Sequence, residues 1–262
     1  MNTTSPMISF LITHYNRSQD LLLCINAIRA LDLSNYEIVV CDDASELQHL
    51  EIIQQYPIDQ LLLANKNGGL AANINRGLHA CRGQYIIYCQ EDFMLSNQLP
   101  TILPECLELL SSKKLDLIRF VSNMNFNSTS SLSTNINRIP KFAFRNFLQN
   151  YYQYSDHPFI TTKDFHPTFG FYQEETSGRY GETEYAIRML KSAAKIGITK
   201  QAFATTIEGS QSVLANESGA VTNSFSFNKK AMQWARAFRL YAELLLYDKK
   251  NRGLKTYKNF RN

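Results

Sequence analysis

No apolar run in the 262-residue sequence approaches the ~18 residues that a membrane-spanning helix needs, so we expect no crossing of a bilayer. The opening residues, MNTTSPMISF, have no basic stretch ahead of an apolar one, which argues against a secretory signal. The five cysteines are odd in number and show no C-x-x-C spacing, which argues against a disulfide framework or a zinc site. We therefore expect reduced thiols and a cytoplasmic protein.

Two glycine-rich phosphate-binding motifs are also missing. No G-x-G-x-x-G follows the first apolar run, and the sequence contains no G-x-x-x-x-G-K-[ST]. Their absence argues against a dinucleotide-binding enzyme and a P-loop protein. The formal net charge of +4 is mild and predicts no nucleic-acid partner.

The first part of the chain alternates short, β-rich apolar runs with helical patterns. Strands are expected at residues 7–13, 36–41, 60–64, 85–89 and 116–121. Because these runs are apolar throughout rather than at every second position, we expect them to be buried on both faces. Strands that alternate with helices predict an α/β fold with a mostly parallel, doubly wound sheet.

The pattern changes after residue 121. Residues 122–137 are rich in Ser, Asn and Thr, which predicts a surface loop, and residues 139–181 are rich in aromatic side chains without clear periodicity. Helices are expected at residues 182–196 and 229–246. We therefore expect an α/β half at residues 1–121 and an appended helical half at residues 122–262 within one compact unit.

Polar side chains follow three of the expected strands, at the edge of a parallel sheet where ligands bind. The residues are the run Thr13–Arg17, the pair Asp42-Asp43, and Gln90-Glu91-Asp92. A hydroxyl, an aromatic ring and a basic group after the first strand suit a base and a phosphate. A carboxylate after the second strand suits a base or ribose, and the acidic pair after the fourth suits Mg²⁺ or Mn²⁺, which would neutralise a diphosphate.

Four blocks of sequence carry a resemblance to a known family: SFLITHYNR (Ser9–Arg17), EIVVCDDAS (Glu37–Ser45), NGGLAANINRGLHACRGQYIIYCQED (Asn67–Asp92) and GETEYAIR (Gly181–Arg188). They resemble the family 2 glycosyltransferases of the GT-A fold, and the first three blocks follow that family's order and spacing. The resemblance implies transfer of a sugar, with inversion, from a nucleotide-diphosphate donor that is commonly UDP-linked. It also implies an acceptor hydroxyl and a divalent metal on the diphosphate.

Carried over residue by residue, the resemblance assigns Thr13 and Tyr15 to the nucleotide, Asp43 to the uracil, Glu91 to the ribose and Asp92 to the metal.

Two positions depart from the family's pattern. Gln90 stands where the first acid of the D-x-D motif is expected. The family often has Arg-Asn beside the diphosphate, and this chain has Ile74-Asn75 there. Asn75 therefore keeps the predicted diphosphate contact, and the positive charge of the missing arginine has to come from Arg17 or Arg76.

An inverting transfer needs a base beside the acceptor hydroxyl. The family places an acid about six residues before a helix Arg, and Glu182 lies six residues before Arg188. Glu184 is the competing candidate. Two positions apart on a helix, these side chains do not share a face, so we expect only one of them to be the base.

The end of the chain is strongly basic. From Lys229 onward, ten basic residues accompany two acidic ones, and Trp234, Phe238, Tyr241 and Leu245 form one helical stripe. Such a stripe is typical of core packing. Together with the charge it also suits a peripheral contact of residues 229–262 with anionic lipid at the inner face of the membrane, near a saccharide or lipid-linked acceptor.

The sequence thus predicts a nucleotide-sugar transferase of surface polysaccharide or glycoconjugate synthesis. Two alternatives remain. A nucleotidyltransferase would share the sheet and the acidic metal site, and a catalytically silent nucleotide-binding homologue would share the fold with an altered D-x-D motif.

Overall fold

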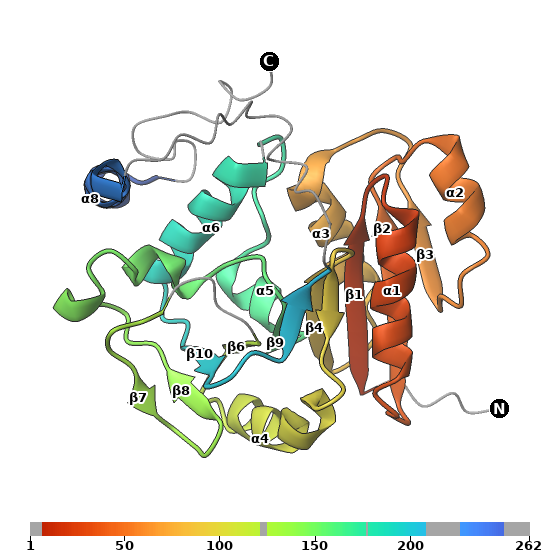
Figure 1. Cartoon of the computed structure of the whole chain (residues 1–262), viewed down its shortest axis with the longest axis horizontal. Helices are drawn as coiled ribbons and strands as arrows, with labels where there is room; N and C mark the ends of the chain where they lie inside the picture. The colour runs from red at the N-terminus through yellow and green to blue at the C-terminus, as the bar shows by residue number, and fades with distance from the viewer. Residues whose placement is uncertain (1–6, 121–124, 177, 208–225, 249–262) are drawn as a thin grey trace.

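The computed structural model describes residues 7–120, 125–176, 178–207 and 226–248. Within these residues, a nine-stranded sheet carries helices on both faces (Figure 1). In spatial order its strands are β3 (Gln60–Leu63), β2 (Tyr36–Asp42), β1 (Ile8–His14), β4 (Tyr85–Gln90), β9 (Phe159–Thr162), β6 (Leu117–Arg119), β10 (Ile196–Thr199), β8 (Ile136–Arg138) and β7 (Ser130–Ser131). A second, two-stranded sheet pairs β5 (Phe93–Leu95) with β11 (Ala204–Thr206).

The four strands β3-β2-β1-β4 are parallel, as the alternating pattern predicts. They are connected by α1 (Ser18–Arg29), α2 (Leu47–Ile53) and α3 (Gly69–Ala80). Every residue of β1 is buried, which confirms that this strand is covered on both faces. The carboxyl ends of β1, β2 and β4 consequently lie at one edge of the sheet, where the predicted ligand-binding residues gather.

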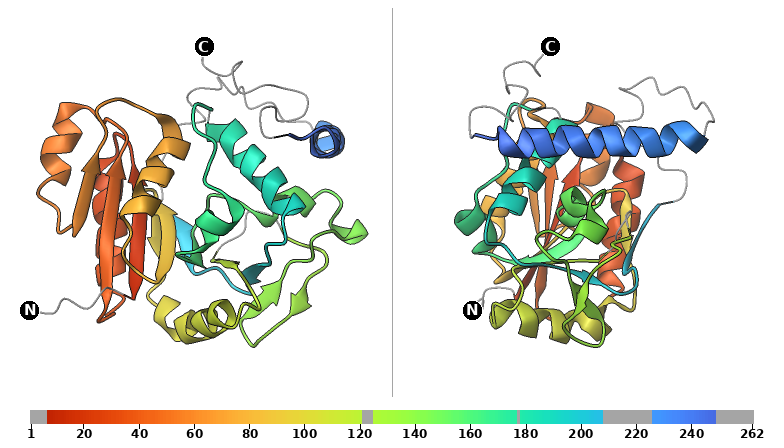
Figure 2. Two further views of the ribbon diagram at one scale, coloured as in Figure 1. Left: turned by 180° about the vertical axis from the view of Figure 1, so that it is seen from behind. Right: turned by 90° about the vertical axis from the view of Figure 1, so that its left-hand side faces the viewer.

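Two hydrophobic cores lie on the two faces of the sheet. Phe10 and Ile12 of β1 face a core with α1 and α4 (Leu99–Ser111), whereas Leu11 faces a core with α3, α5 (Phe165–Phe169) and α6 (Gly178–Lys191). Figure 2 shows this layered arrangement from two further sides. The second core includes side chains from α3 and from α6, so it fixes these two helices relative to each other.

The fold differs from the expected one mainly in the second half of the chain, which is not helical throughout. Strand β7 lies within the segment 122–137 for which a surface loop is expected, and it pairs with β8, which begins there. Strand β9 arises in the aromatic segment for which no strand is expected, and it pairs antiparallel with both β4 and β6. The expected helix at 182–196 instead ends at Lys191, and Ile196 begins β10. Gly197 allows this strand to pack closely, because a Cβ at that position would lie 2.4 Å from the Leu115 side chain.

Short 3₁₀ helices η1 (Phe144–Asn146) and η2 (Asn150–Gln153) precede β9. The long helix α8 (Ser226–Leu245) lies outside the sheet, beside this segment and α6 (Figure 2). No helix in the described part of the chain is both long enough and apolar enough to span a membrane. The five cysteines are free and buried, as expected.

Most of the aromatic stripe of α8 is exposed, although Tyr241 packs against Tyr151. Trp234, Phe238 and Leu245 are 46%, 61% and 83% exposed, whereas Ala237 and Leu240 are buried. The buried face is displaced by about one position from the stripe, because the Tyr151 hydroxyl bonds the Leu240 carbonyl and fixes the rotation of the helix. The interpretation of the stripe as core packing is therefore wrong for these three side chains.

Candidate active site

The loop after β1 brings a cation to the acidic pair after β4. Arg17 Nη1 lies 3.2 Å from Asp92 Oδ2, and Arg17 Nε lies 3.9 Å from Glu91 Oε1. The backbone N–H of Tyr15 also bonds the Glu91 carboxyl group. At the end of β1, the buried Thr13 hydroxyl lies 3.3 Å from the Tyr88 hydroxyl. Residues predicted from two separate sequence blocks are thus brought together at one edge of the sheet.

Asp43 joins this edge to the start of α3. Its two carboxylate oxygens each accept a backbone N–H, from Gly68 and from Gly69, both at 2.8 Å. Glycine suits both positions, since Gly69 has a φ of +81° and a Cβ on Gly68 would lie only 3.0 Å from that of Ala72. The N-G-G turn therefore fixes the carboxylate that the resemblance assigns to the uracil.

Burial disfavours the ionised forms of the two carboxyl groups, Glu91 and Asp92. Burial raises the pKa of Glu91 to about 8. Burial also raises the pKa of Asp92, and the nearby charge of Arg17 opposes this rise. Asp92 Oδ1 is buried and has no hydrogen-bond partner among the residues that the structure describes. A buried carboxylate oxygen without a partner raises the free energy of the folded state, so this oxygen is suited to a cation or a donor group from a ligand.

A metal held by protein ligands alone does not fit this region, because no group of three or more His, Cys, Asp or Glu converges in the described part of the chain. A metal held jointly by a diphosphate and one carboxylate does fit it. The open Asp92 Oδ1 supplies the hard oxygen ligand that Mg²⁺ and Mn²⁺ prefer.

The amide of Asn75 is engaged elsewhere. Its Nδ2 donates to the Tyr172 carbonyl and to Glu174 Oε1, both at 2.9 Å, and its Oδ1 accepts the Tyr172 N–H. These bonds tie α3 to the segment between α5 and α6. The other candidate cation, Arg76, donates to the Asp42 carbonyl. The diphosphate contact predicted for Asn75 therefore stays a prediction, and Arg17 is the arginine that reaches the acidic pair.

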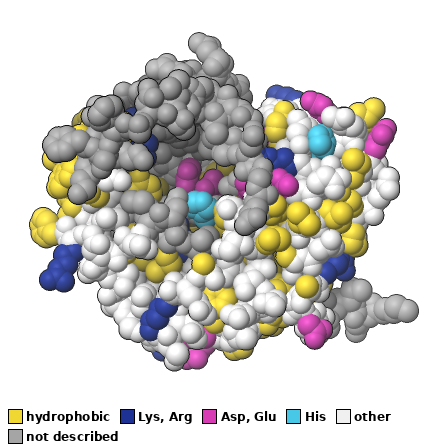
Figure 3. All heavy atoms as spheres, viewed as in Figure 1, with side chains coloured by type: hydrophobic (Ala, Val, Ile, Leu, Met, Phe, Trp, Pro, Cys, Tyr) yellow, Lys and Arg dark blue, Asp and Glu magenta, His cyan; other side chains and the backbone are white. Residues whose placement is uncertain are grey.

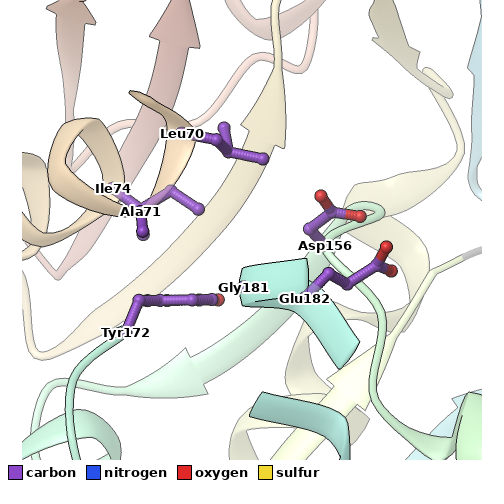
Figure 4. Close-up of a pocket in the computed structure, with 7 residues that line it drawn as sticks. All are labelled: Leu70, Ala71, Ile74, Asp156, Tyr172, Gly181 and Glu182. Atoms are coloured by element: carbon purple, nitrogen blue, oxygen red, sulfur yellow. The ribbon is translucent and has the colours of Figure 1, made fainter. Parts of the chain in front are cut away.

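A second cluster of acids lies between α3 and α6. A small hollow there is lined by Leu70, Ala71, Ile74, Asp156, Tyr172, Gly181 and Glu182. Figure 4 shows the carboxyl groups of Asp156 and Glu182 side by side, across from the apolar side chains of α3. In Figure 3, acidic side chains and a histidine gather near the centre of the face in view. The hollow thus offers an apolar wall and a carboxyl wall to a ligand.

The two candidate bases have different surroundings. Glu184 is 3% exposed, and both of its oxygens pair with Arg188, at 3.0 Å each. The Tyr247 hydroxyl donates a further bond to Glu184 at 2.7 Å. Glu182 lines the hollow and is half-buried. Of the two, only Glu182 faces space in which a substrate can lie.

Two residues near Glu182 were missed by the sequence reasoning. Asp156 lies just before β9, in an aromatic segment without periodicity, so no pattern marks it. Arg119 is fully buried, and its Nε and Nη2 have no hydrogen-bond partner in the described part of the chain. A charged residue inside the apolar run of β6 is a signal that could have found Arg119, because buried cations are rare unless paired.

Comparison with known proteins decides the family. The profile of glycosyl transferase family 2 matches residues 9–177. The chain belongs to this family. Chondroitin synthase from Escherichia coli is 25% identical over 133 residues, which cover 50% of this chain and 19% of that protein. The glycosyltransferase GlyG from Streptococcus pneumoniae is 28% identical over 109 residues, which cover 40% of this chain and 36% of that protein.

Each of these two matches thus covers less than two fifths of the relative's length. Solved glycosyltransferase structures share the fold over most of this family 2 chain. Staphylococcus aureus TarS 1–349 in complex with UDP-GlcNAc aligns with a TM-score of 0.61 at 17% identity, covering 91% of this chain and 71% of that one. The mannosyltransferase PcManGT from Pyrobaculum calidifontis, in complex with GDP-Man and Mn²⁺, aligns with a TM-score of 0.57 at 13% identity, covering 97% and 68%. The expected GT-A fold is confirmed.

Proposed function

We propose that this family 2 chain transfers a glycosyl group, with inversion, from a nucleotide-diphosphate sugar to an acceptor hydroxyl. UDP-sugars are the preferred donor class, and the product belongs to surface polysaccharide or glycoconjugate synthesis. Residues 1–121 would bind the donor, and residues 122–262 would bind a saccharide or lipid-linked acceptor. The observation that carries the proposal is the contact of Arg17 with the Glu91-Asp92 pair, with Asp43 at the neighbouring strand end of the same GT-A sheet.

The arrangement of charges supports a nucleotide-diphosphate donor. Asp43, fixed by the turn before α3, would accept a hydrogen bond from the base, and Tyr15 and Thr13 would lie along the nucleoside. Glu91 would contact the ribose, and Arg17 would turn from the acidic pair toward the phosphates. Asp92 would hold Mg²⁺ or Mn²⁺, which supplies positive charge to the leaving diphosphate when bound.

The position of Glu182 supports its proposed role as the base that deprotonates the acceptor hydroxyl. Its carboxyl group lines the hollow opposite α3, whereas both carboxylate oxygens of Glu184 accept hydrogen bonds from Arg188. In the proposed step, Glu182 takes the proton of the acceptor hydroxyl as that oxygen bonds the anomeric carbon. General bases of this kind contribute about 10²- to 10⁴-fold to a rate.

The proposal is tested with the full chain and a set of nucleotide-sugars, with and without Mn²⁺. We expect release of UDP from one or more UDP-sugars only when metal is present, and loss of this activity in Asp92→Ala with the fold unchanged by circular dichroism. Full activity of Asp92→Ala would overturn the metal role. Binding of UDP without turnover of any sugar would identify a silent homologue, and pyrophosphate formation from a nucleoside triphosphate would identify a nucleotidyltransferase.

A membrane-facing surface is also proposed, on the outer side of α8. An aromatic patch forms where Phe147 contacts Trp234 and Phe238, with ring centroids 5.4 Å and 5.9 Å apart, and Phe144 beside it is 85% exposed. The neighbouring Arg145, Arg236 and Arg239 are exposed. Aromatic side chains beside arginines suit the interface of an anionic bilayer, where each basic residue contributes about 1 kcal/mol. With its reduced cysteines, the enzyme would act at the cytoplasmic face.

Co-sedimentation of the full chain with vesicles of neutral or anionic phospholipid tests this surface. We expect binding to anionic vesicles that weakens with salt, and a marked loss in the double variant Trp234→Ser, Phe238→Ser. Leu47→Ser on α2 is the matched control, because this exposed leucine lies on another part of the molecule (Figure 1). Equal sedimentation of the double variant and the control would refute the contact.

A further inference from the structure

Two carboxyl groups lie on one wall of the hollow between α3 and α6. Asp156 comes from the segment before β9, and Glu182 comes from the beginning of α6 (Figure 4). Residues far apart in the chain therefore place their acids next to each other. The opposite wall is apolar, so no group of α3 that lines the hollow can neutralise them.

The two carboxyl groups are close enough to share a hydrogen bond. Burial raises the pKa of Asp156 well above its usual range, and the charge and hydrogen bond of Glu182 raise it further. Two carboxylates at such a distance cannot both be ionised at neutral pH. The proton of the pair is therefore held on Asp156, which donates it to Glu182.

Arg119 is the cation that faces the pair. It reaches them from β6, and its pKa falls only to about 10 because burial lowers it while the charges of Glu182 and Asp156 raise it. Its Nη1 donates to the carbonyls of Tyr152 and Gln153. At neutral pH one positive charge thus balances one negative charge in this cluster.

The remaining titratable side chains around Asp156 are neutral at pH 7. Burial lowers the pKa of His157, the neighbour of Asp156 in the chain. Burial raises the pKa of Tyr88 on β4 and of Tyr172 in the segment before α6 well above their usual range. Among the described residues of this cluster, Asp156 is therefore the carboxyl group whose protonated form is favoured by burial and by the neighbouring Glu182.

We propose that Asp156 is a positioning residue for Glu182: it donates its proton to one oxygen of the Glu182 carboxylate and leaves the other oxygen facing the hollow. Arg119 balances the single negative charge of the pair. This inference rests on the proposed glycosyl transfer and adds to it the group that orients the base.

Glu182 can accept the proton of the acceptor while Asp156 keeps its own. The acceptor O–H proton moves to the free oxygen of Glu182, and the acceptor oxygen forms a bond to the anomeric carbon. The bond from that carbon to the diphosphate oxygen breaks, and its electron pair leaves on the diphosphate. Asp156 keeps its own proton throughout, so a neutral hydrogen-bond donor of the same shape can replace it.

The decisive variants are Asp156→Asn, Asp156→Ala and Glu182→Gln, with Asp164→Asn as a matched control on the exposed start of α5. Because the asparagine amide still donates to Glu182, we expect kcat of Asp156→Asn to stay within about threefold of the unmodified chain at pH 7. Loss of that hydrogen bond in Asp156→Ala should lower kcat by about 10- to 100-fold. Glu182→Gln should lose about 10²- to 10⁴-fold.

The pH profile separates positioning from a merely structural role. In the unmodified chain we expect kcat to fall at alkaline pH as Asp156 loses its proton and repels Glu182. Asp156→Asn should lack this alkaline fall. Infrared spectra without any donor give a second readout. Glu91 also contributes to the absorption of protonated carboxyl groups at pH 7, so this absorption should weaken by the Asp156 component in Asp156→Asn and stay unchanged in Asp164→Asn.

Opposite results are clear-cut. If Asp156→Asn is as inactive as Glu182→Gln, Asp156 has to lose its proton in the reaction and the assignment is overturned. It is also overturned if Asp156→Asn keeps the alkaline fall, or if its infrared spectrum is unchanged. Should Asp156→Ala fail to fold, the pH profile and spectrum of Asp156→Asn still decide. Full activity of Glu182→Gln would instead overturn the proposed base, whatever the infrared spectrum shows.

Discussion

Buried acids are held in two different ways in this chain. In the parallel half, burial by itself would raise the pKa of Glu37 and of Asp42, but hydrogen bonds to both carboxylate oxygens lower them below their usual values. At the candidate site, burial raises the pKa of Asp92 and of Asp156, and their nearby cations do not reverse that rise.

The difference separates acids that stabilise the sheet from acids that are suited to a ligand. An acid with complete hydrogen bonds contributes to folding in its charged form. An acid with an open oxygen, such as Asp92, or with a shared proton, such as Asp156, leaves the folded state with an unfavourable interaction that a metal ion or a hydrogen-bond donor of a ligand can relieve. Substitutions in the two groups should therefore change different measured quantities.

The largest effect is expected at Glu182. Glu182→Gln should lower kcat by about 10²- to 10⁴-fold with little change in donor affinity or melting temperature, because this side chain is half-buried and lines the hollow. Steady-state kinetics and isothermal titration with UDP measure the two quantities.

Glu184→Gln is the matched control, two residues away. It breaks a buried pair with Arg188, so it should lower the free energy of unfolding by about 3 kcal/mol and leave the turnover of the folded protein largely intact. The opposite pattern, with turnover lost in Glu184→Gln and kept in Glu182→Gln, would show that the base has been assigned to the wrong side chain.

Much of the donor side could be predicted from sequence because its signals are local. Apolar runs of β-rich residues predicted β1, β2 and β4, and a parallel sheet necessarily brings their carboxyl ends to one edge. The acids at those ends, Asp43 and Asp92, could therefore be found before their contacts were known. The contact of Arg17 with Asp92 also spans only neighbouring strand ends.

The acceptor side could be predicted only in part because its contacts join distant segments. Strand β9 pairs with β4 and β6 across 40 or more positions of the chain, and no local periodicity indicates such pairing. Asp156 acquires its role only when β9 places it beside α6. The hydrogen bonds of the Asn75 side chain likewise depend on partners almost 100 positions away, in the segment 172–174.

The next effect concerns the open oxygen of Asp92. A ligand at 100 times its dissociation constant stabilises a native protein by about 2.7 kcal/mol, which corresponds to a rise of about 5 °C or more in melting temperature for a chain of this size. We expect UDP with Mn²⁺ to produce such a rise in the unmodified chain. Asp92→Asn should lose most of the metal-dependent part, as measured by differential scanning fluorimetry.

The control for this experiment is Asp32→Asn. Asp32 is exposed in the turn before β2, at the opposite end of the strands, and its φ of +51° is one that asparagine also tolerates. It should keep the full shift. If Asp92→Asn keeps the shift as well, Asp92 is not a metal ligand, and its open oxygen does not mark it as a ligand-binding acid.

The smallest effect is expected at Glu37. Its oxygens accept bonds from Ser9 Oγ at 2.5 Å, from the Arg82 backbone N–H at 2.7 Å, and from Arg82 Nε and Gln60 Nε2 at 2.8 Å each. We expect Glu37→Gln to lower the free energy of unfolding by about 1–3 kcal/mol at pH 7, and to leave kcat unchanged. Urea unfolding at several pH values measures it.

The sign of the pH dependence tests whether Glu37 belongs to the first group of acids. Its pKa in the folded chain lies below that of an unfolded glutamate, about 4.3, so its stabilising contribution is complete above that value. The contribution is lost as pH falls through the folded pKa, because the folded state then binds the proton as well. The stability difference between the unmodified chain and Glu37→Gln should therefore shrink from pH 7 toward pH 3. A difference that grows in acid would show that Glu37 is held protonated, as Asp156 is, and would remove the distinction between the two groups.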